Sequence, residues 1–263
     1  MPDHSLSKRF RISADLTEYG LRRWDLHECS QLNEMKVDVS LMNMIAAWKT
    51  NGDAIMVEQM PIFGGYSGGI EETAICDVAA TLASYALLDC NLHLDGPIHI
   101  RWGTTTTRET LQIAAHAAAA IDLNTDLLIG NQYYTMAGPC TEMCLLETAT
   151  QAITDTASGR ELISGTASSK GVVKDRTTGM EARMMGEAAI AVAGMNVHDV
   201  NVALDKIISQ YETEFTKPPP GKRFQDCYDL VSVTPSAEYL KTYDKAVSTL
   251  SECGIDLPKI GRA

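Results

Sequence analysis

The chain has 263 residues, of which 45% are hydrophobic and 21% are charged; this ordinary globular composition excludes wholesale disorder. Its formal net charge of −12 at pH 7 argues against nucleic-acid binding, because nucleic-acid-binding domains normally carry a basic face. The sequence shows neither a secretory signal nor a membrane span, and its seven cysteines form no CxxC pair, so we expect a cytoplasmic protein with reduced thiols.

The first predicted elements lie between residues 28 and 89, after a segment, 1–27, that shows no clear periodicity. A helix is predicted over 39–50, and the apolar run 54–57 predicts a strand that leads into Glu58 and Gln59. A glycine-rich loop follows, and residues 70–89 predict a long amphipathic helix. The apolar residues that share one face of this helix are Ile75, Val78, Ala79, Leu82, Tyr85 and Ala86.

The same alternation continues from residue 97 to residue 193. The next strand is predicted at 97–102, and Thr106 with Glu109 forms a capping-box pattern for a helix over 107–121. The strand that follows begins at Asp126 and leads into Asn131 and Gln132, and Gly138-Pro139 predicts the start of another helix. A short strand at 162–164 and a helix at 180–193 complete the series.

The last part of the chain is predicted to be helical. One helix is expected over 198–213, and Lys217-Pro218-Pro219-Pro220-Gly221 is a stiff break after it. A final helix is predicted to begin at Thr234-Pro235 and to end near Gly254. This region is typical of a helical cap or an oligomer contact.

Four strands that are each followed by a helix predict an α/β fold with parallel strands and right-handed crossovers. An open doubly wound sheet and a (β/α) barrel both fit this pattern. A barrel needs eight strands, so if the fold is a barrel, the chain holds roughly its last half.

Polar residues follow the predicted strands, where parallel α/β folds gather their active sites. Glu58 follows a fully apolar run, so we expect partial desolvation to raise its pKa and to suit it to proton transfer. The alternative is that Glu58 pairs with Arg101 for architecture alone. Further polar residues at predicted strand ends, which we expect to face the substrate, are Gln59, His99, Arg101 and Asn131.

Gln132 and Tyr134 lie two residues apart, so in an extended segment their side chains point the same way and can orient a small polar substrate. The alternative is a strand-end turn whose tyrosine packs in the core. Cys140 and Cys144 could supply half of a metal site, but no other Cys or His cluster supplies the remaining ligands, so we predict no metal.

Long stretches of the sequence point to one family: VEQMPIFGGY at 57–66, HLDGP at 93–97, HIRWG at 99–103, NQYY at 131–134, AGPCTEMC at 137–144 and TGMEARMMGE at 178–187. They closely resemble the C-terminal half of the monomethylamine:corrinoid methyltransferases of methanogens that use methylamine and of related bacteria. The resemblance runs from about Ser30 to the end of the chain.

The resemblance implies a partial TIM-barrel domain over 1–263, with a divergent segment at 1–27, a C-terminal helical extension at 216–263 and homo-oligomeric assembly. It implies transfer of the methyl group of monomethylamine to the Co(I) corrinoid of a separate carrier protein, so that this chain binds no cofactor directly. The family's reactive group is pyrrolysine, whose ring imine adds the amine. By resemblance, Glu58 would handle protons at that adduct, and Gln132 and Tyr134 would orient it. The further polar residues at predicted strand ends would face the substrate or the corrinoid: Gln59, His99, Arg101 and Asn131.

The chain also departs from the family. The pyrrolysine would fall at or just before Met1, and residues 16–26 differ from the family's small, glycine-rich pattern. We therefore expect a fragment encoded downstream of an amber codon that was read as stop, inactive alone and prone to associate through its open edges. The alternatives are an inactive half-barrel that only assembles with a partner chain, and a self-sufficient lyase that uses Glu58 as its base.

Overall fold

The computed structural model describes residues 22, 24–31 and 36–258. The position that the resemblance assigns to pyrrolysine, and most of the divergent segment 16–26, lie outside these residues.

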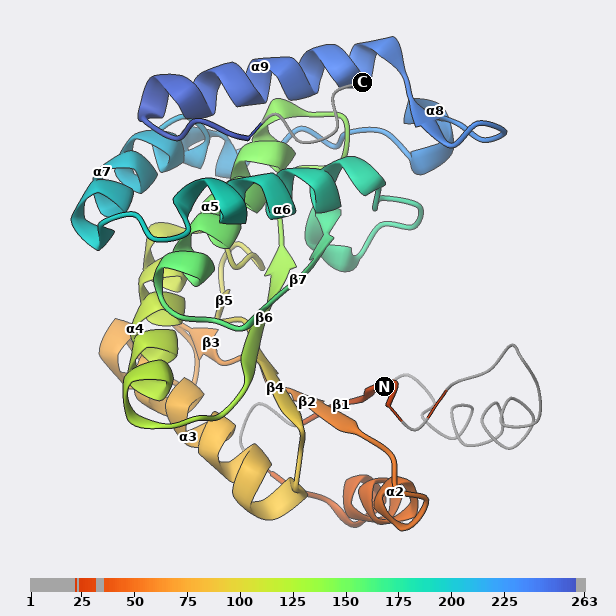
Figure 1. The fold of residues 1–263 in the computed structure, drawn as a ribbon, viewed down its shortest axis with the longest axis vertical. Helices are drawn as coiled ribbons and strands as arrows, with labels where there is room; N and C mark the ends of the chain where they lie inside the picture. The colour runs from red at the N-terminus through yellow and green to blue at the C-terminus, as the bar shows by residue number, and fades with distance from the viewer. Residues whose placement is uncertain (1–21, 23, 32–35, 259–263) are drawn as a thin grey trace.

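A five-stranded parallel sheet organises the chain, with the strands side by side in chain order (Figure 1). Its members are β1 (His27–Ser30), β2 (Ile55–Glu58), β4 (Leu92–Asp95), β6 (Ile129–Tyr134) and β7 (Leu162–Ala167). A doubly wound sheet reverses its strand order at a switch point, whereas this sheet advances in one direction. The order is that of a barrel wall, which decides between the two architectures that fit the sequence.

Helices cover one face of this sheet: α2 (Val39–Thr50), α3 (Ile70–Leu88), α4 (Arg108–Asn124), α5 (Glu142–Ala157) and α6 (Gly179–Val192). Cys29, Ile55 and Val57 pack with α2 in one apolar cluster, and Ile129 packs with α4 in another. Because side chains alternate along a strand, the neighbouring positions project from the opposite face. We call that opposite face the inner face; it carries Glu28, Ser30, Met56, Glu58, Leu94, Gly130, Gln132 and Tyr134.

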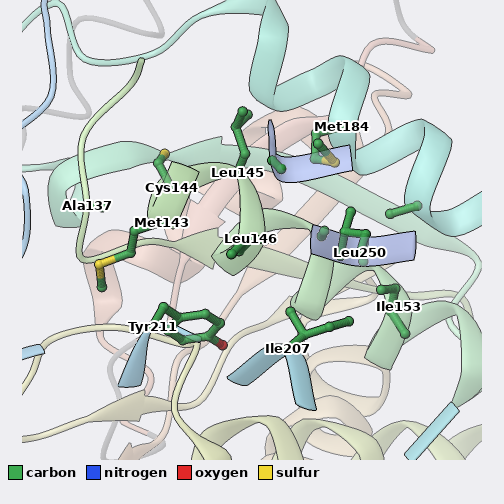
Figure 2. Close-up of a cluster of buried hydrophobic side chains, with 14 of the residues drawn as sticks. Ala137, Met143, Cys144, Leu145, Leu146, Ile153, Met184, Ile207, Tyr211 and Leu250 are labelled. Carbon is green, nitrogen blue, oxygen red and sulfur yellow. The ribbon is translucent and has the colours of Figure 1, made fainter. Parts of the chain in front are cut away.

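The largest core lies in a helical layer at the end of the molecule opposite α2 (Figure 1). It joins α5 and α6 to α7 (Val197–Ile208) and α9 (Ala237–Cys253). Figure 2 shows Leu145 and Ile153 of α5 with Met184, Ile207 and Leu250 from the other three helices. None of the described helices is long and apolar enough to cross a membrane.

Short elements complete the described chain. Strands β3 (Ile62–Phe63) and β5 (Ile98–His99) form a parallel pair, and β8 (Tyr228–Asp229) and β9 (Thr234–Pro235) form an antiparallel one. The remaining elements are the 3-10 turns η1 (Ser168–Gly171) and η2 (Glu212–Thr216) and the single-turn helix α8 (Phe224–Cys227).

The strand predicted at 97–102 is wrong, because the barrel strand is β4, at Leu92–Asp95. Its polar residues His93 and Asp95 hid it: both side chains are buried on the helix-covered face, where a purely apolar strand pattern was expected. Of the predicted range, only Ile98 and His99 pair, as β5. Strand β1 lies at the edge of the segment without clear periodicity and was not predicted as a strand.

Two predicted helix starts are also wrong, because in each case a later threonine makes the N-cap hydrogen bond. Helix α5 begins at Glu142 with Thr141 as its N-cap, while Gly138 donates its backbone N–H to the carbonyl of Pro219 at 3.0 Å. Helix α4 is capped by Thr107, because the hydroxyl of Thr106 instead donates to Glu147 Oε1 at 2.6 Å.

In the C-terminal part, two helix boundaries move. Helix α7 ends at Ile208 rather than at 213, and α9 begins at Ala237 with Ser236 as its N-cap. Thr234 and Pro235 pair as β9 and lie outside the helix. The helix predicted over 39–50 has the same bounds as α2.

Part of the predicted apolar face of α3 is turned outward, while Val78 and Tyr85 pack against the core. Ile75 is 69% exposed and Leu82 is 45% exposed, although periodicity placed them on one apolar side. The buried side of α3 consists instead mostly of small or polar residues: Thr73, Ala74, Asp77, Ala80, Thr81, Ser84 and Leu88. Asp77 on this side lies near the buried charges of Asp95 and Arg160, which explains why a polar face is buried.

Candidate functional site

Glu58 is the last residue of β2 and projects from the inner face of the sheet. It stands level with Ser30 of β1, whose hydroxyl donates to Glu58 Oε2 at 3.1 Å. The side chain is only 8% exposed. Burial first, and then the carboxyl group of Glu28, raise the pKa of Glu58 to about 7, while the bond from Ser30 opposes the shift. Glu58 is therefore poised to gain or lose a proton near neutral pH.

Sequence reasoning missed Glu28 and Ser30, because β1 was not recognised as a strand. Both residues are exposed on the inner face, beside the buried carboxyl of Glu58. The signal in the sequence was a two-residue alternation, with Glu28 and Ser30 alternating with His27 and Cys29. The structure shows that His27 and Cys29 are buried. Glu28 and Glu58 together place two carboxyl groups at this part of the inner face.

Gln132 and Tyr134 project from the same inner face, two residues apart on β6. The amide oxygen of Gln132 is buried and has no hydrogen-bond partner within the described part of the chain. Burial, with smaller contributions from the charges of Glu58 and Glu28, raises the pKa of Tyr134 to about 12. The phenol is therefore a hydrogen-bond donor at neutral pH, and it lies close enough to both carboxyl groups to sense their charge.

A bulge in β7 shapes the end of β6. Gln132 pairs with Ser164 and Tyr133 pairs with Thr166, so Gly165 is the extra residue. Tyr134 then stands opposite Ala167, and its ring packs against Gly171. Gly171 has a φ of +67°, and a Cβ there would lie 3.1 Å from Tyr134 Cε1, so glycine leaves room for the ring.

Asn131 does not belong to this group, which corrects its expected orientation toward the substrate. Being one residue out of phase with Gln132, it faces the helix-covered side, where its Nδ2 donates to Asp155 Oδ1 at 2.9 Å. Gln59 follows β2, is 1% exposed, and donates its backbone N–H to the carbonyl of Leu94 at 2.9 Å.

His99 and Arg101 do not end a long strand as predicted. His99 belongs to the short strand β5, with its ring edge-on to Phe63 at 5.1 Å, and burial lowers its pKa. The Arg101 guanidinium lies over the ring of Trp102, 4.4 Å from the centroid. Within the described residues, Arg101 makes no ion pair with Glu58, so the architectural alternative for Glu58 has no support.

A second polar cluster lies on the helix-covered face, directly behind the inner-face residues. Arg160 Nη1 contacts Asp95 Oδ2 at 2.7 Å, and Arg160 Nε lies 3.0 Å from Asp155 Oδ1. Burial raises the pKa of Asp77 and of Asp95, and the Arg160 charge opposes both shifts. We call Asp77, Asp95, Asn131, Asp155 and Arg160 the rear cluster. Neither here nor elsewhere among the described residues are three or more His, Cys, Asp or Glu side chains placed to hold a metal ion.

Comparison with known proteins identifies relatives over nearly the whole chain. A sequence model of the family "Monomethylamine methyltransferase MtmB" matches residues 1–255. The chain is 58% identical to monomethylamine methyltransferase MtmB1 of Methanosarcina barkeri and 56% identical to MtmB1 of Methanosarcina acetivorans, each over 254 residues. These alignments cover 97% of this chain and 55% of each relative, so the chain spans about half the length of the curated relatives it matches.

A solved structure matches as well. The crystal structure of the Methanosarcina barkeri monomethylamine methyltransferase superposes with a TM-score of 0.89 at 58% identity, over 90% of this chain and 52% of that one. The hydroxylamine complex of MtmB gives the same values.

Proposed function

This chain belongs to the monomethylamine methyltransferase MtmB family, and on that premise we propose that it takes part in transferring the methyl group of monomethylamine to the Co(I) corrinoid of a separate carrier protein, in methanogenesis. In this proposal the chain forms one partial-barrel domain in the cytoplasm, and the carrier protein, rather than this chain, holds the corrinoid. Glu58, Gln132 and Tyr134 form its methylamine site.

The observation that carries the proposal is the pairing of a carboxyl group that titrates near pH 7 with a buried amide oxygen that has no partner among the described residues. Methylamine is protonated at neutral pH, and its N–H groups need acceptors. The Glu58 carboxylate and Gln132 Oε1 are two such acceptors on one face. Glu58 can then accept the proton that methylammonium must lose before its nitrogen becomes a nucleophile.

Tyr134 adds a donor to this pair of acceptors. Its raised pKa keeps the phenol protonated, so it can donate to a nitrogen lone pair or to Glu58 after proton transfer. In the family that the sequence resembles, the imine of pyrrolysine supplies the electrophile that the amine attacks. An amide, a phenol and a titratable carboxyl group on one face fit the donors and acceptors of an amine held for such an attack.

The site is tested by titrating the chain with methylammonium while the ¹³C resonance of the Glu58 carboxyl group is followed by NMR. We expect a saturable shift and a lower pKa of Glu58, because the bound cation favours the carboxylate. Di- and trimethylammonium, which offer fewer N–H donors, are expected to bind more weakly. Equal shifts for all three amines, or none, would remove the support for an amine site.

A non-enzymatic role in assembly is the second candidate, and the exposure of Glu28 and Ser30 on the inner face favours it. A methyl-transfer assay with monomethylamine and a reduced corrinoid protein, with and without a pyrrolysine-containing MtmB, tests whether the chain is active by itself. We expect no turnover by the chain alone. Turnover by the chain alone would contradict both the assembly role and the expectation that it is inactive by itself.

We also propose homo-oligomeric assembly, supported by exposed apolar side chains on α3. Ile75 and Leu87 are 69% and 63% exposed, and both lie on a helix whose polar side is buried instead. Sedimentation velocity over a concentration series tests this proposal, and a single monomeric boundary at all concentrations would contradict it.

A further inference from the structure

Both main-chain hydrogen-bonding groups of Tyr134, its N–H and its carbonyl, bond to one residue, Thr105, of the loop before α4. Thr105 donates its N–H to the carbonyl of Tyr134 at 3.2 Å, and Thr105 Oγ1 accepts the N–H of Tyr134 at 3.0 Å. The hydroxyl of Thr104 donates to the same carbonyl. Tyr134 thus has both of its main-chain groups satisfied by the threonine run 104–107.

These contacts stand where hydrogen bonds from a longer strand β4 would lie. Strand β4 pairs with β6 only from Ile129 to Asn131, and the described ladder between them stops there. The chain leaves β4 at Gly96, so the edge of β6 that faces β4 is left open beside Gln132 and Tyr134. Thr105 occupies that edge and supplies the hydrogen bonds that a longer β4 would have made.

Side-chain hydrogen bonds to helix α5 hold these threonines in place. Thr105 Oγ1 donates to Gln151 Oε1 at 2.5 Å, and both side chains are fully buried. Thr106 Oγ1 donates to Glu147 Oε1 at 2.6 Å and lies 2.8 Å from Thr104 Oγ1. The same Glu147 carboxyl group accepts the backbone N–H groups of Met136 and Ala137, immediately after β6. Tyr134 is therefore enclosed by contacts that lead to α5.

We propose that Thr105, held by Gln151, is a positioning residue that sets the place of the Tyr134 side chain beside Glu58 on the inner face. This inference rests on the proposed methylamine site for its functional consequence, while the placement of Tyr134 stands by itself. A hydroxyl at 105 is needed because it must accept from Tyr134 N–H and donate to Gln151 at once. Valine has nearly the same shape and can do neither.

The test compares three variants of the full chain. Thr105→Val removes the hydroxyl, Thr105→Ser keeps it, and Thr107→Val removes a hydroxyl from the same run that caps α4 without contacting Tyr134. The Tyr134 ring resonances, assigned through Tyr134→Phe, and the pKa of Glu58 are read by NMR, and stability is read by urea unfolding. Methylammonium binding is measured on the same samples.

We expect Thr105→Val to move the Tyr134 resonances and the Glu58 pKa and to weaken methylammonium binding by about tenfold, the lower range for losing a supporting contact. Thr105→Ser should restore all three. Thr107→Val should lower the urea midpoint but leave Tyr134 and Glu58 unchanged. Gln151→Met, which keeps the Thr105 hydroxyl but removes its acceptor, should shift Tyr134 in the same direction by less, and it replaces Thr105→Val as the deciding variant if the latter does not fold.

Two results distinguish failure of the positioning role of Thr105 from failure of the proposed amine site. Unchanged Tyr134 resonances and Glu58 pKa in Thr105→Val, or equally in Gln151→Met, overturn the positioning role. If these readouts move as expected while the unsubstituted chain does not bind methylammonium, Thr105 positions Tyr134 as inferred, and it is the proposed amine site that fails.

Discussion

The two faces of the five-stranded sheet carry two polar clusters in which burial raises the pKa of a carboxyl group, but their surroundings differ. On the inner face, burial raises the pKa of Glu58 to about 7; on the rear, burial also raises the pKa of Asp95. The rear cluster surrounds a guanidinium that is 0% exposed and contacts two carboxylates. The inner face instead carries the exposed Glu28. Both faces hold buried polar atoms that have no hydrogen-bond partner among the described residues, such as Gln132 Oε1 on the inner face and Asp95 Oδ1 on the rear.

The difference teaches that a raised pKa does not by itself mark a site. Arg160 also donates to the main-chain carbonyls of Gly130 and Ala114, at 2.9 and 3.0 Å, so it joins two barrel strands to α4 and α5. The Nη1 and Nη2 donors of Arg160 thus bond to groups of the protein itself. The inner face differs from the rear cluster in accessibility, because Glu28 and Ser30 on it are exposed, whereas all five residues of the rear cluster are buried.

The largest expected effect comes from Arg160→Met. Removal of the guanidinium leaves Asp95 and Asp155 buried without their cation, so we expect a loss of about 3–5 kcal/mol in the free energy of unfolding by urea denaturation. The matched control is Arg108→Met, whose guanidinium also contacts two carboxylates, Asp205 and Glu212, but is 38% exposed. That change should cost about 1 kcal/mol or less. Equal losses would mean that burial does not distinguish the two arginines.

Glu58→Gln should change the pH dependence of stability. The pKa of Glu58 in the folded chain, about 7, lies above its value in the unfolded chain. The stability that Glu58 contributes is therefore fully present below about pH 4.5 and is lost as the pH rises through 7. Glutamine cannot ionise, so the variant should gain stability relative to the unsubstituted chain between pH 5 and pH 8. Urea midpoints at several pH values measure this, and parallel curves for the two proteins would contradict it. The variant should also bind methylammonium more weakly.

Asp77→Asn should have a smaller effect at neutral pH. The pKa of Asp77 is raised well above its usual value by burial, so the neutral form is favoured, and asparagine is neutral too. We expect stability within about 1 kcal/mol of the unsubstituted chain at pH 7. Asp155→Asn, the matched control, removes a carboxylate that contacts Arg160 and should cost clearly more. If Asp77→Asn is the more damaging change, Asp77 is ionised and belongs to the ion pairs.

The smallest effect on stability is expected for Ile75→Lys combined with Leu82→Lys on the outer face of α3. Both side chains are exposed, so unfolding should change by about 0.5 kcal/mol or less. The sedimentation coefficient should nevertheless fall if this face joins copies of the chain. Glu71→Lys at an exposed position of the same helix changes the net charge by the same two units and serves as the charge-matched comparison.

Periodicity in the sequence predicted several elements well because their residues respond to local constraints. Helix α2 has the predicted bounds, and the run 54–57 predicted β2 together with the strand-end place of Glu58. The spacing of Gln132 and Tyr134 predicted that they share a face, and both project from the inner face of β6. Whether these three residues act on methylamine stays a prediction.

The predictions that were wrong for β4, α3 and Thr106 share a physical cause. Strand β4 and the buried side of α3 carry polar residues that only the rear cluster makes tolerable, because Arg160 comes from about 65 positions beyond Asp95 to pair with it. A pattern read along the chain cannot register such a partner. The same holds for Thr106, whose hydroxyl was assigned to a helix cap and instead reaches Glu147 on α5.

The sequence by itself determined the alternation of strands and helices, the family and the polar residues at the ends of strands, because these depend on local periodicity and on long stretches of shared residues. Only the tertiary structure decided which polar residues face each other. A one-residue step along β6 separates Asn131 from Gln132, and the sheet's two faces give them opposite surroundings. Long-range pairing to Arg160 places a cation beside the buried carboxyl groups of Asp95 and Asp155 on one face, whereas the other face keeps Glu28 and Ser30 exposed.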